Sequence, residues 1–155
     1  MANAERAREP IAPLRKSIVV GRTPAEAFEI FTARFGTWWP FQKFSVNQAK
    51  ARGCAMETRL GGAIYEIAPD GKRVAWGHVI AWEPPHRFVM SWYPGRDPET
   101  GQEVELRFIA VKEGTRVELE HRDWEKLGDI ATEERRNYEN GWAVVFNQRF
   151  AEACR

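Results

Sequence analysis

Three side chains in this sequence are of types that could carry acid–base chemistry: Glu66, His121 and Tyr138. Glu66 alternates with Ile64 in a short strand-like run, so its direction depends on which face of that strand is covered. On an inward face, apolar surroundings would raise the pKa of the Glu66 carboxyl, which could then act as a general acid. On the outer face it would be solvated, or join Arg59 and Arg107 in a cross-strand ladder of charges.

The direction of the histidine side chains, inward or toward solvent, must also be inferred from the strand pattern. His121 follows Val117 and Leu119 at alternate positions and should therefore point inward, either as a hydrogen-bonded core residue or as a polar contact to a ligand. His78 lies in a strand that looks covered on both sides, so the pattern does not settle its direction. His86 falls in a turn and should be solvated.

No pattern typical of a metal centre or of nucleophilic catalysis is present. The three histidines lack H-x-x-x-H spacing, and Cys54 and Cys154 form no metal or redox motif. A phosphate-binding loop, a dinucleotide fingerprint and a nucleophile elbow are also missing from the sequence. We therefore expect no metal and no cofactor, and we expect Cys54 to be a small buried apolar side chain.

Aromatic residues are the strongest candidates for a binding site. Seven Trp, nine Phe and three Tyr make up 12% of the chain, and such side chains can fill a core or line a pocket for a flat, apolar molecule. Glycines among them would leave an uneven interior, where pockets are typically apolar with a few polar groups. The residues that we expect to line a cavity are Tyr65, Trp76, His78, Phe88, Trp92, Phe108, His121, Tyr138, Gly141, Trp142 and Val145.

The elements that must position these residues begin with a strand over 14–20 and a helix that starts at Thr23. Thr23 and Glu26 have the types and spacing of a capping box, with Pro24 in the first turn. Gly36 is expected to end this helix, and a turn or short helix at Trp38-Trp39-Pro40-Phe41 to follow.

The middle of the chain has the pattern of consecutive strands. Turn residues separate the runs, and the last two strands alternate clearly, with one apolar face. A one-faced antiparallel meander curls by its own twist and leaves a concave side to be covered. The expected strands are 54–60, 63–68, 74–82, 87–93, 102–111 and 115–122.

The longest helical pattern comes last, over 132–153, with Thr132 as the expected N-cap. Tyr138, Trp142 and Val145 fall on its apolar face. Gly141, in mid-helix, costs about 1 kcal/mol relative to alanine, which indicates that something approaches the backbone there. We expect this helix to cover the concave side of the sheet, either as a simple cover or as one wall of a ligand cavity.

Length and charge limit the remaining possibilities. The 155 residues predict one domain over 14–155 preceded by an arm over 1–13. A net charge of +1 with both signs interspersed argues against a nucleic-acid or membrane partner. No apolar run approaches the ~18 residues of a membrane span, and no secretory signal is visible, so we expect a cytoplasmic location.

Several short motifs follow one another in a recognisable order: Gly61-Gly62, Gly77-His78-Val79, Pro84-Pro85, Ser91-Trp92, the strand over 115–121 and Gly141-Trp142. In these motifs, over roughly residues 15–153, the sequence resembles the START and birch-pollen-allergen-like (SRPBCC) superfamily, in the branch named for the activator of the heat-shock-protein-90 ATPase homologue (AHSA-type). The resemblance implies the α+β helix-grip fold, a curved antiparallel sheet of about six or seven strands around a long C-terminal helix. It does not imply one function, because this fold hosts carriers, receptors, cyclases and co-chaperone domains.

Three functions therefore remain open. The first, which we favour, is a binding protein that holds a small hydrophobic or aromatic molecule between sheet and helix. The second is an enzyme similar to polyketide cyclases and dehydratases, using Glu66, His121 or Tyr138. The third is a protein-interaction domain, although a chaperone partner is not expected because the named activator's role belongs to a larger protein. A homodimer through a sheet edge or the Trp38-Trp39 region is also compatible with the sequence.

Overall fold

The computed structural model describes residues 10–155. Most of the predicted arm lies outside these residues, and 10–13 form no helix or strand. The strands are β1 (Leu14–Val20), β2 (Gly53–Met56), β3 (Ala63–Ile67), β4 (Arg73–Glu83), β5 (Arg87–Trp92), β6 (Gln102–Val111) and β7 (Gly114–Arg122). The helices are α2 (Pro24–Phe31), α3 (Phe35–Trp38), α4 (Ala131–Val144) and α5 (Ala151–Ala153), with a π-helical stretch, Val145–Phe150, between the last two.

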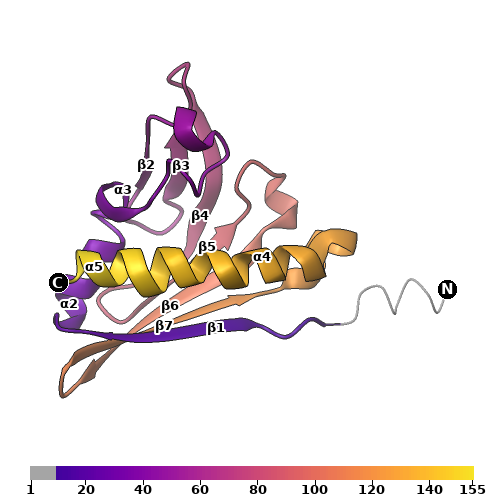
Figure 1. Ribbon diagram of the computed structural model, residues 1–155. Coiled ribbons are helices and arrows are strands. Elements are labelled where there is room, and N and C mark those ends of the chain that lie inside the picture. Colours follow the sequence, from indigo (N-terminus) through magenta and orange to yellow (C-terminus); the bar gives the residue numbers. More distant parts are fainter. Residues whose placement is uncertain (1–9) are drawn as a thin grey trace.

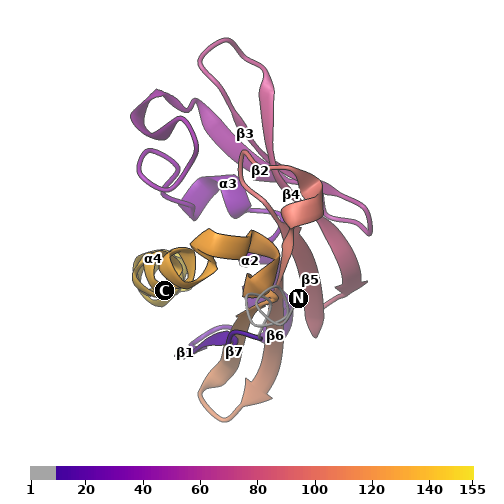
Figure 2. The same cartoon turned by 90° about the vertical axis from the view of Figure 1, so that its right-hand side faces the viewer.

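The strands form one antiparallel sheet in the order β1-β7-β6-β5-β4-β3-β2. The sheet curls, and the continuous helix from α4 through the π-helical stretch to α5 runs across its concave side, with α5 next to α2 (Figure 1). Figure 2 shows the same helix nearly end-on, with the sheet bent around it and α3 beside it. This is the helix-grip arrangement, and it confirms the predicted fold class.

The helix termini differ in how well the sequence predicted them. The capping box of α2 is confirmed, since the Thr23 hydroxyl accepts from the Glu26 N–H and the Glu26 carboxylate accepts from the Thr23 N–H. The prediction that Gly36 ends this helix is wrong, because α2 ends at Phe31 and Gly36 lies inside α3. A side chain at Gly36 would collide with the backbone carbonyl of Cys54, so the glycine permits α3 to pack on β2.

The long C-terminal helix begins one residue earlier than predicted, after Ile130, which makes no side-chain cap. The expected N-cap Thr132 is therefore wrong, because the 3-10 segment Trp124–Ile130 leads directly into α4. Among the strands, β2 ends at Met56 rather than at residue 60. There the Glu57 carboxylate accepts from the Ala63 N–H at 2.8 Å and closes a turn.

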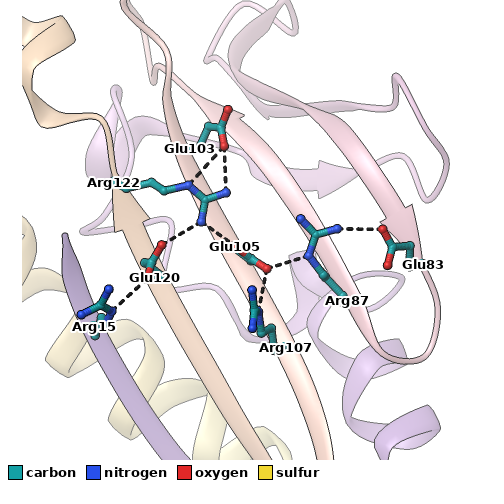
Figure 3. Close-up of polar contacts among 8 residues, drawn as sticks. All are labelled: Arg15, Glu83, Arg87, Glu103, Glu105, Arg107, Glu120 and Arg122. Atoms are coloured by element: carbon teal, nitrogen blue, oxygen red, sulfur yellow. Dashed lines mark hydrogen bonds and ion pairs between the residues drawn. The ribbon is translucent and has the colours of Figure 1, made fainter.

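The convex face of the sheet carries a continuous network of charges (Figure 3). Its centre is Glu105, which is only 4% exposed and accepts from Arg87, Arg107 and Arg122 at 2.6–2.7 Å. Burial opposes ionisation, but the three guanidinium groups outweigh it and lower the pKa of Glu105 to about 2. Arg107 thus belongs to a charge ladder, as one of the two interpretations of this region predicted, but Glu66 does not.

Candidate functional site

A cavity of about 350 Å³ lies between α4, the inner ends of β4 and β5, and the loop that follows α3. This size is within the range of about 300–1,000 Å³ typical of small-molecule sites. The residues that line it are Trp39, Lys43, Phe44, Ser45, Val46, Trp76, Trp92, Pro94, Arg96, Glu134, Asn137, Tyr138, Gly141, Trp142 and Val145. Helix, strand and loop residues that are far apart in the sequence therefore meet at this cavity.

Four tryptophans form the inner wall of the cavity, and each is at most 5% exposed: Trp39, Trp76, Trp92 and Trp142. Their neighbouring ring centroids are 5.4–6.0 Å apart, mostly tilted or edge-to-face. All four indole N–H groups donate to acceptors of the protein, which are the Phe44 carbonyl, Glu66, the Tyr138 hydroxyl and His121. The rings are thus held in fixed orientations and present mainly carbon to the cavity.

Glu66 fixes both a wall and the entrance loop of this cavity. Its fully buried carboxylate accepts from Trp76 Nε1 at 2.6 Å, from the Val46 N–H at 2.6 Å, and from the Asn47 N–H and side-chain amide, both at 2.9 Å. Burial raises the pKa of Glu66, but the four donors together bring it below its ordinary value. Both alternatives for Glu66 are therefore wrong. It points inward rather than to solvent, and it is ionised with its acceptor capacity used rather than a general acid with a raised pKa.

His121 points inward, as its alternation predicts, and lies behind the cavity wall. Its ring stacks on Trp124 with centroids 3.8 Å apart, Nδ1 accepts from Trp142 Nε1 at 3.1 Å, and Nε2 donates to Gln102 Oε1 at 3.2 Å. Burial, assisted by the charge of Arg135, lowers the pKa of His121 well below its ordinary value. His121 is therefore a neutral core residue with both nitrogens occupied.

Tyr138 is the one acid–base candidate that lines the cavity. Its hydroxyl oxygen accepts from Trp92 Nε1 at 3.1 Å. Burial raises the pKa of Tyr138 to about 12, so the phenol keeps its proton at neutral pH. That proton can be donated to an oxygen or nitrogen of a bound molecule.

Six of the predicted cavity residues line the cavity: Trp76, Trp92, Tyr138, Gly141, Trp142 and Val145. Phe88 and Phe108 lie instead in the core beneath α2, where both contact Phe28 edge-on. The Phe44 ring is the group that approaches the α4 backbone at Gly141, and a Cβ there would lie 3.7 Å from it, an ordinary contact that leaves room for alanine but not for a long side chain.

Tyr65 and His78 lie on the convex face of the sheet, contrary to the prediction. The Arg73 guanidinium sits over the Tyr65 ring at 4.0 Å, and His78 Nδ1 is 2.9 Å from the Tyr93 hydroxyl. Tyr65 faces outward by plain alternation, since its neighbours Ile64 and Glu66 are both buried. For His78 the reason is irregular register, since the pairing of β3 with β4 shifts between Ile64 and Tyr65 and leaves Trp76 without a partner. Gly77 therefore opposes Trp92 on the inner face, and His78 opposes Ser91 on the outer one.

Sequence reasoning missed the residues that form the entrance. They come from two loops, one over 39–46, which begins in the predicted turn or short helix, and one over 93–101, and from the first turns of α4. A Cβ on Gly95 would approach Val46 to 2.9 Å, so the two loops meet. The missed residues are Trp39, Lys43, Phe44, Ser45, Val46, Pro94, Arg96, Glu134 and Asn137. The aromatic residues Trp39 and Phe44 were the only signal, and their loop gave no periodicity by which to orient them.

The described part of the chain, residues 10–155, has no group of three or more His, Cys, Asp and Glu residues placed to hold a metal ion. Burial raises the pKa of the Cys54 thiol to about 12, which disfavours the reactive thiolate. Over the same residues, no helix is both long and apolar enough to span a membrane.

Comparison with known proteins identifies relatives of the whole domain. The family model described as "Activator of Hsp90 ATPase homolog 1-like protein" matches residues 22–154. No curated protein sequence matches the chain. Among solved structures, Txn09, described as an anthrahydroquino-γ-pyrone synthase complexed with SUM, is 33% identical with a TM-score of 0.62, over 94% of this chain and 98% of that one.

Two further structures have the same fold. CalC from Micromonospora echinospora, described as a self-sacrificing resistance protein, is 27% identical with a TM-score of 0.68, over 94% of both chains. Protein BH1534 from Bacillus halodurans is 16% identical with a TM-score of 0.68, over 94% of this chain and 99% of that one, and shows likeness of fold alone.

Proposed function

This chain belongs to the family of activator of Hsp90 ATPase homolog 1-like proteins, and from that premise we propose that it binds a small, flat, largely apolar molecule in the cavity between α4 and the loop over 39–46. The fold supports a ligand-binding or cyclase-like domain. The more specific proposal, that the chain binds an aromatic ligand without catalysing a reaction, rests on the chemistry of the cavity.

The tryptophan wall is the observation that carries this proposal. Because Trp39, Trp76, Trp92 and Trp142 are fixed by hydrogen bonds within the protein, a flat molecule meets a surface that is already ordered. Such preorganisation lowers the entropy that binding would otherwise cost. The few polar groups at the entrance can then orient the ligand.

The arrangement of acid–base groups favours binding over catalysis. An enzyme using Glu66, His121 and Tyr138 needs at least two of them at one open cavity, and of the three only Tyr138 lines it. Glu66 accepts four hydrogen bonds from the protein, and both nitrogens of His121 are engaged. Neither has free capacity for a substrate.

Titration with the neutral fluorescent aromatic N-phenylnaphthylamine tests the proposal. We expect saturable binding to the wild-type protein and loss of binding in Gly141→Leu, whose side chain would extend beyond the 3.7 Å gap to Phe44. Gly141→Ala is the matched control, because its single methyl group only reaches contact with that ring. No saturable binding to wild type, or equal binding to both variants, would rule out this cavity as the site.

A second candidate function, catalysis of a cyclase type in the same cavity, is supported by the 33% identity with a synthase. Tyr138 would then be the proton donor, since its phenol stays protonated and lines the cavity. Turnover of a polyketide-like substrate that falls roughly a hundredfold or more in Tyr138→Phe, with substrate binding retained, would favour this alternative over simple binding.

A further inference from the structure

We propose that the ligand of this cavity carries a negative charge, which Arg96 and Lys43 bind at the entrance, so that the site selects a flat aromatic anion over its neutral counterpart. The inference deepens the proposed function and rests on it, because it assigns the charge of a molecule held by the tryptophan wall. It follows from cations at the entrance whose bonding capacity the protein does not use.

Arg96 is the first of these cations. Its contact within residues 10–155 is a loose ion pair with Glu134 at 3.8 Å, and its guanidinium makes no hydrogen bond there. The arginine side chain is 44% exposed and lines the cavity. A planar guanidinium with free N–H groups can bind a carboxylate or sulfonate through two parallel hydrogen bonds.

Lys43 is the second cation and comes from the opposite loop. It lines the cavity, its ammonium lies 5.8 Å from the centre of the Phe44 ring, and within the described residues it forms no ion pair. Because Val46 and Gly95 bring the two loops together, Lys43 and Arg96 belong to one entrance. With Glu134 as the single carboxylate of the lining, the entrance has a net charge of one positive unit.

Two hydroxyl groups complete the recognition of an oxygen-bearing ligand. Ser45 is one of the residues that line the cavity, and its Oγ is a buried atom with no hydrogen-bond partner among residues 10–155. A buried polar group without a partner is costly, and a ligand oxygen or N–H would satisfy it. The Tyr138 hydroxyl accepts from Trp92 and still has its own proton to donate.

Glu134 is the group against which the ligand must compete. Its carboxylate is 25% exposed and meets Arg96 only at long range, so the pair is weak. An incoming anion can therefore replace Glu134 beside Arg96. Removal of the Glu134 charge should then tighten the binding of an anion, which gives the proposal a gain-of-affinity test.

The experiment compares two fluorescent probes of the same aromatic skeleton, anilinonaphthalene sulfonate and N-phenylnaphthylamine, which lacks the sulfonate. We expect Arg96→Gln to weaken the sulfonate about tenfold and Lys43→Gln roughly threefold, with the neutral probe changed less than about twofold. Glu134→Gln should tighten the sulfonate roughly threefold. Arg149→Gln, which removes an exposed charge outside the cavity, is the control for net charge.

The outcomes separate the two proposals. Equal effects of Arg96→Gln on both probes, or no effect on the sulfonate, would overturn the charge selectivity while leaving the cavity as a binding site. Weakening of the sulfonate by Arg149→Gln as large as that by Arg96→Gln would also overturn it, because the effect would come from overall charge. Failure of both probes to bind the wild-type protein would overturn the proposed function itself.

Discussion

The two faces of the sheet use arginine in different ways. On the convex face, Arg122 hydrogen-bonds Glu103, Glu105 and Glu120 at 2.6–3.2 Å (Figure 3). At the cavity entrance on the concave side, Arg96 has one ion pair at 3.8 Å and no hydrogen bond within residues 10–155. A satisfied guanidinium indicates a role in stability, whereas one with unused donors at a cavity indicates a role in recognition.

The carboxylates of the two faces differ in a parallel way. Glu105 and Glu66 are both buried and both have a lowered pKa. Three arginines keep Glu105 ionised, whereas neutral N–H donors do the same for Glu66. Salt screens charge pairs more than neutral hydrogen bonds, so the two sites should respond differently to ionic strength.

The strongest test of the concave side is Trp142→Ala. We expect a loss of about 3–5 kcal/mol in the free energy of unfolding, because the substitution leaves a cavity in the aromatic wall and removes the donor to His121. Chemical denaturation measures this loss. A change below about 1 kcal/mol would mean that the wall is not tightly packed.

Glu66→Gln should lower the free energy of unfolding by about 2–3 kcal/mol. The amide NH₂ group of the glutamine would face N–H donors, such as those of Val46 and Trp76, that bond to the carboxylate in the wild type. The lowered pKa of Glu66 implies that its stabilisation is present above its ordinary pKa of 4.5 and is lost as the pH falls below that value. Urea denaturation between pH 3 and pH 7 should show a weaker acid dependence in the variant than in the wild type. The difference at pH 7 should hardly change when salt is added.

Glu105→Gln should lower the free energy of unfolding by about 2 kcal/mol at neutral pH. The loss is limited because the three arginines are partly exposed, so water can solvate their guanidinium groups when the carboxylate is removed. With the pKa of Glu105 lowered from 4.5 to about 2, its stabilisation should be full above pH 4.5 and decline as the pH falls toward 2. Molar salt should shrink the difference between wild type and variant. A salt response equal to that of Glu66→Gln would remove the distinction between the two carboxylates.

Gly141→Ala has the smallest expected effect, a gain of roughly 0.5–1 kcal/mol from helix propensity. The added Cβ lies 3.7 Å from the Phe44 ring, an ordinary contact. Thermal denaturation measures the gain, and Gly77→Ala is an instructive counterpart because a Cβ there would collide with the Ser91 carbonyl. Destabilisation by Gly141→Ala would show that the loop over 39–46 cannot shift to accommodate the added methyl group.

The fold could be predicted from the sequence because its signals are local. The Thr23 capping box, the alternation along β6 and β7, and the apolar face of the last helix each follow from spacing within one element. Part of the cavity could be predicted for the same reason, since Tyr138, Trp142 and Val145 share one helix face. Trp76 and Trp92 were predicted to line the cavity only because they are aromatic.

The entrance could not be predicted, because it depends on contacts between loops. Val46, for example, is placed by the hydrogen bond from its N–H to Glu66 and by its close approach to Gly95, neither of which leaves a periodic pattern. Irregular register likewise turned His78 outward, because pure alternation assumes a ladder without shifts. The ionised state of Glu66 required its four donors, of which two are backbone groups that every residue carries.

The tryptophan wall also has an optical consequence. Four of the seven tryptophans line the cavity, and the ring centroid of each lies within 6.0 Å of at least two others. At such separations excitation passes between indoles, so a molecule that quenches one of them dims the group. The intrinsic emission of the protein should therefore report occupancy of the cavity without any label, and an unknown mixture could be screened for ligands by the quenching that each fraction produces.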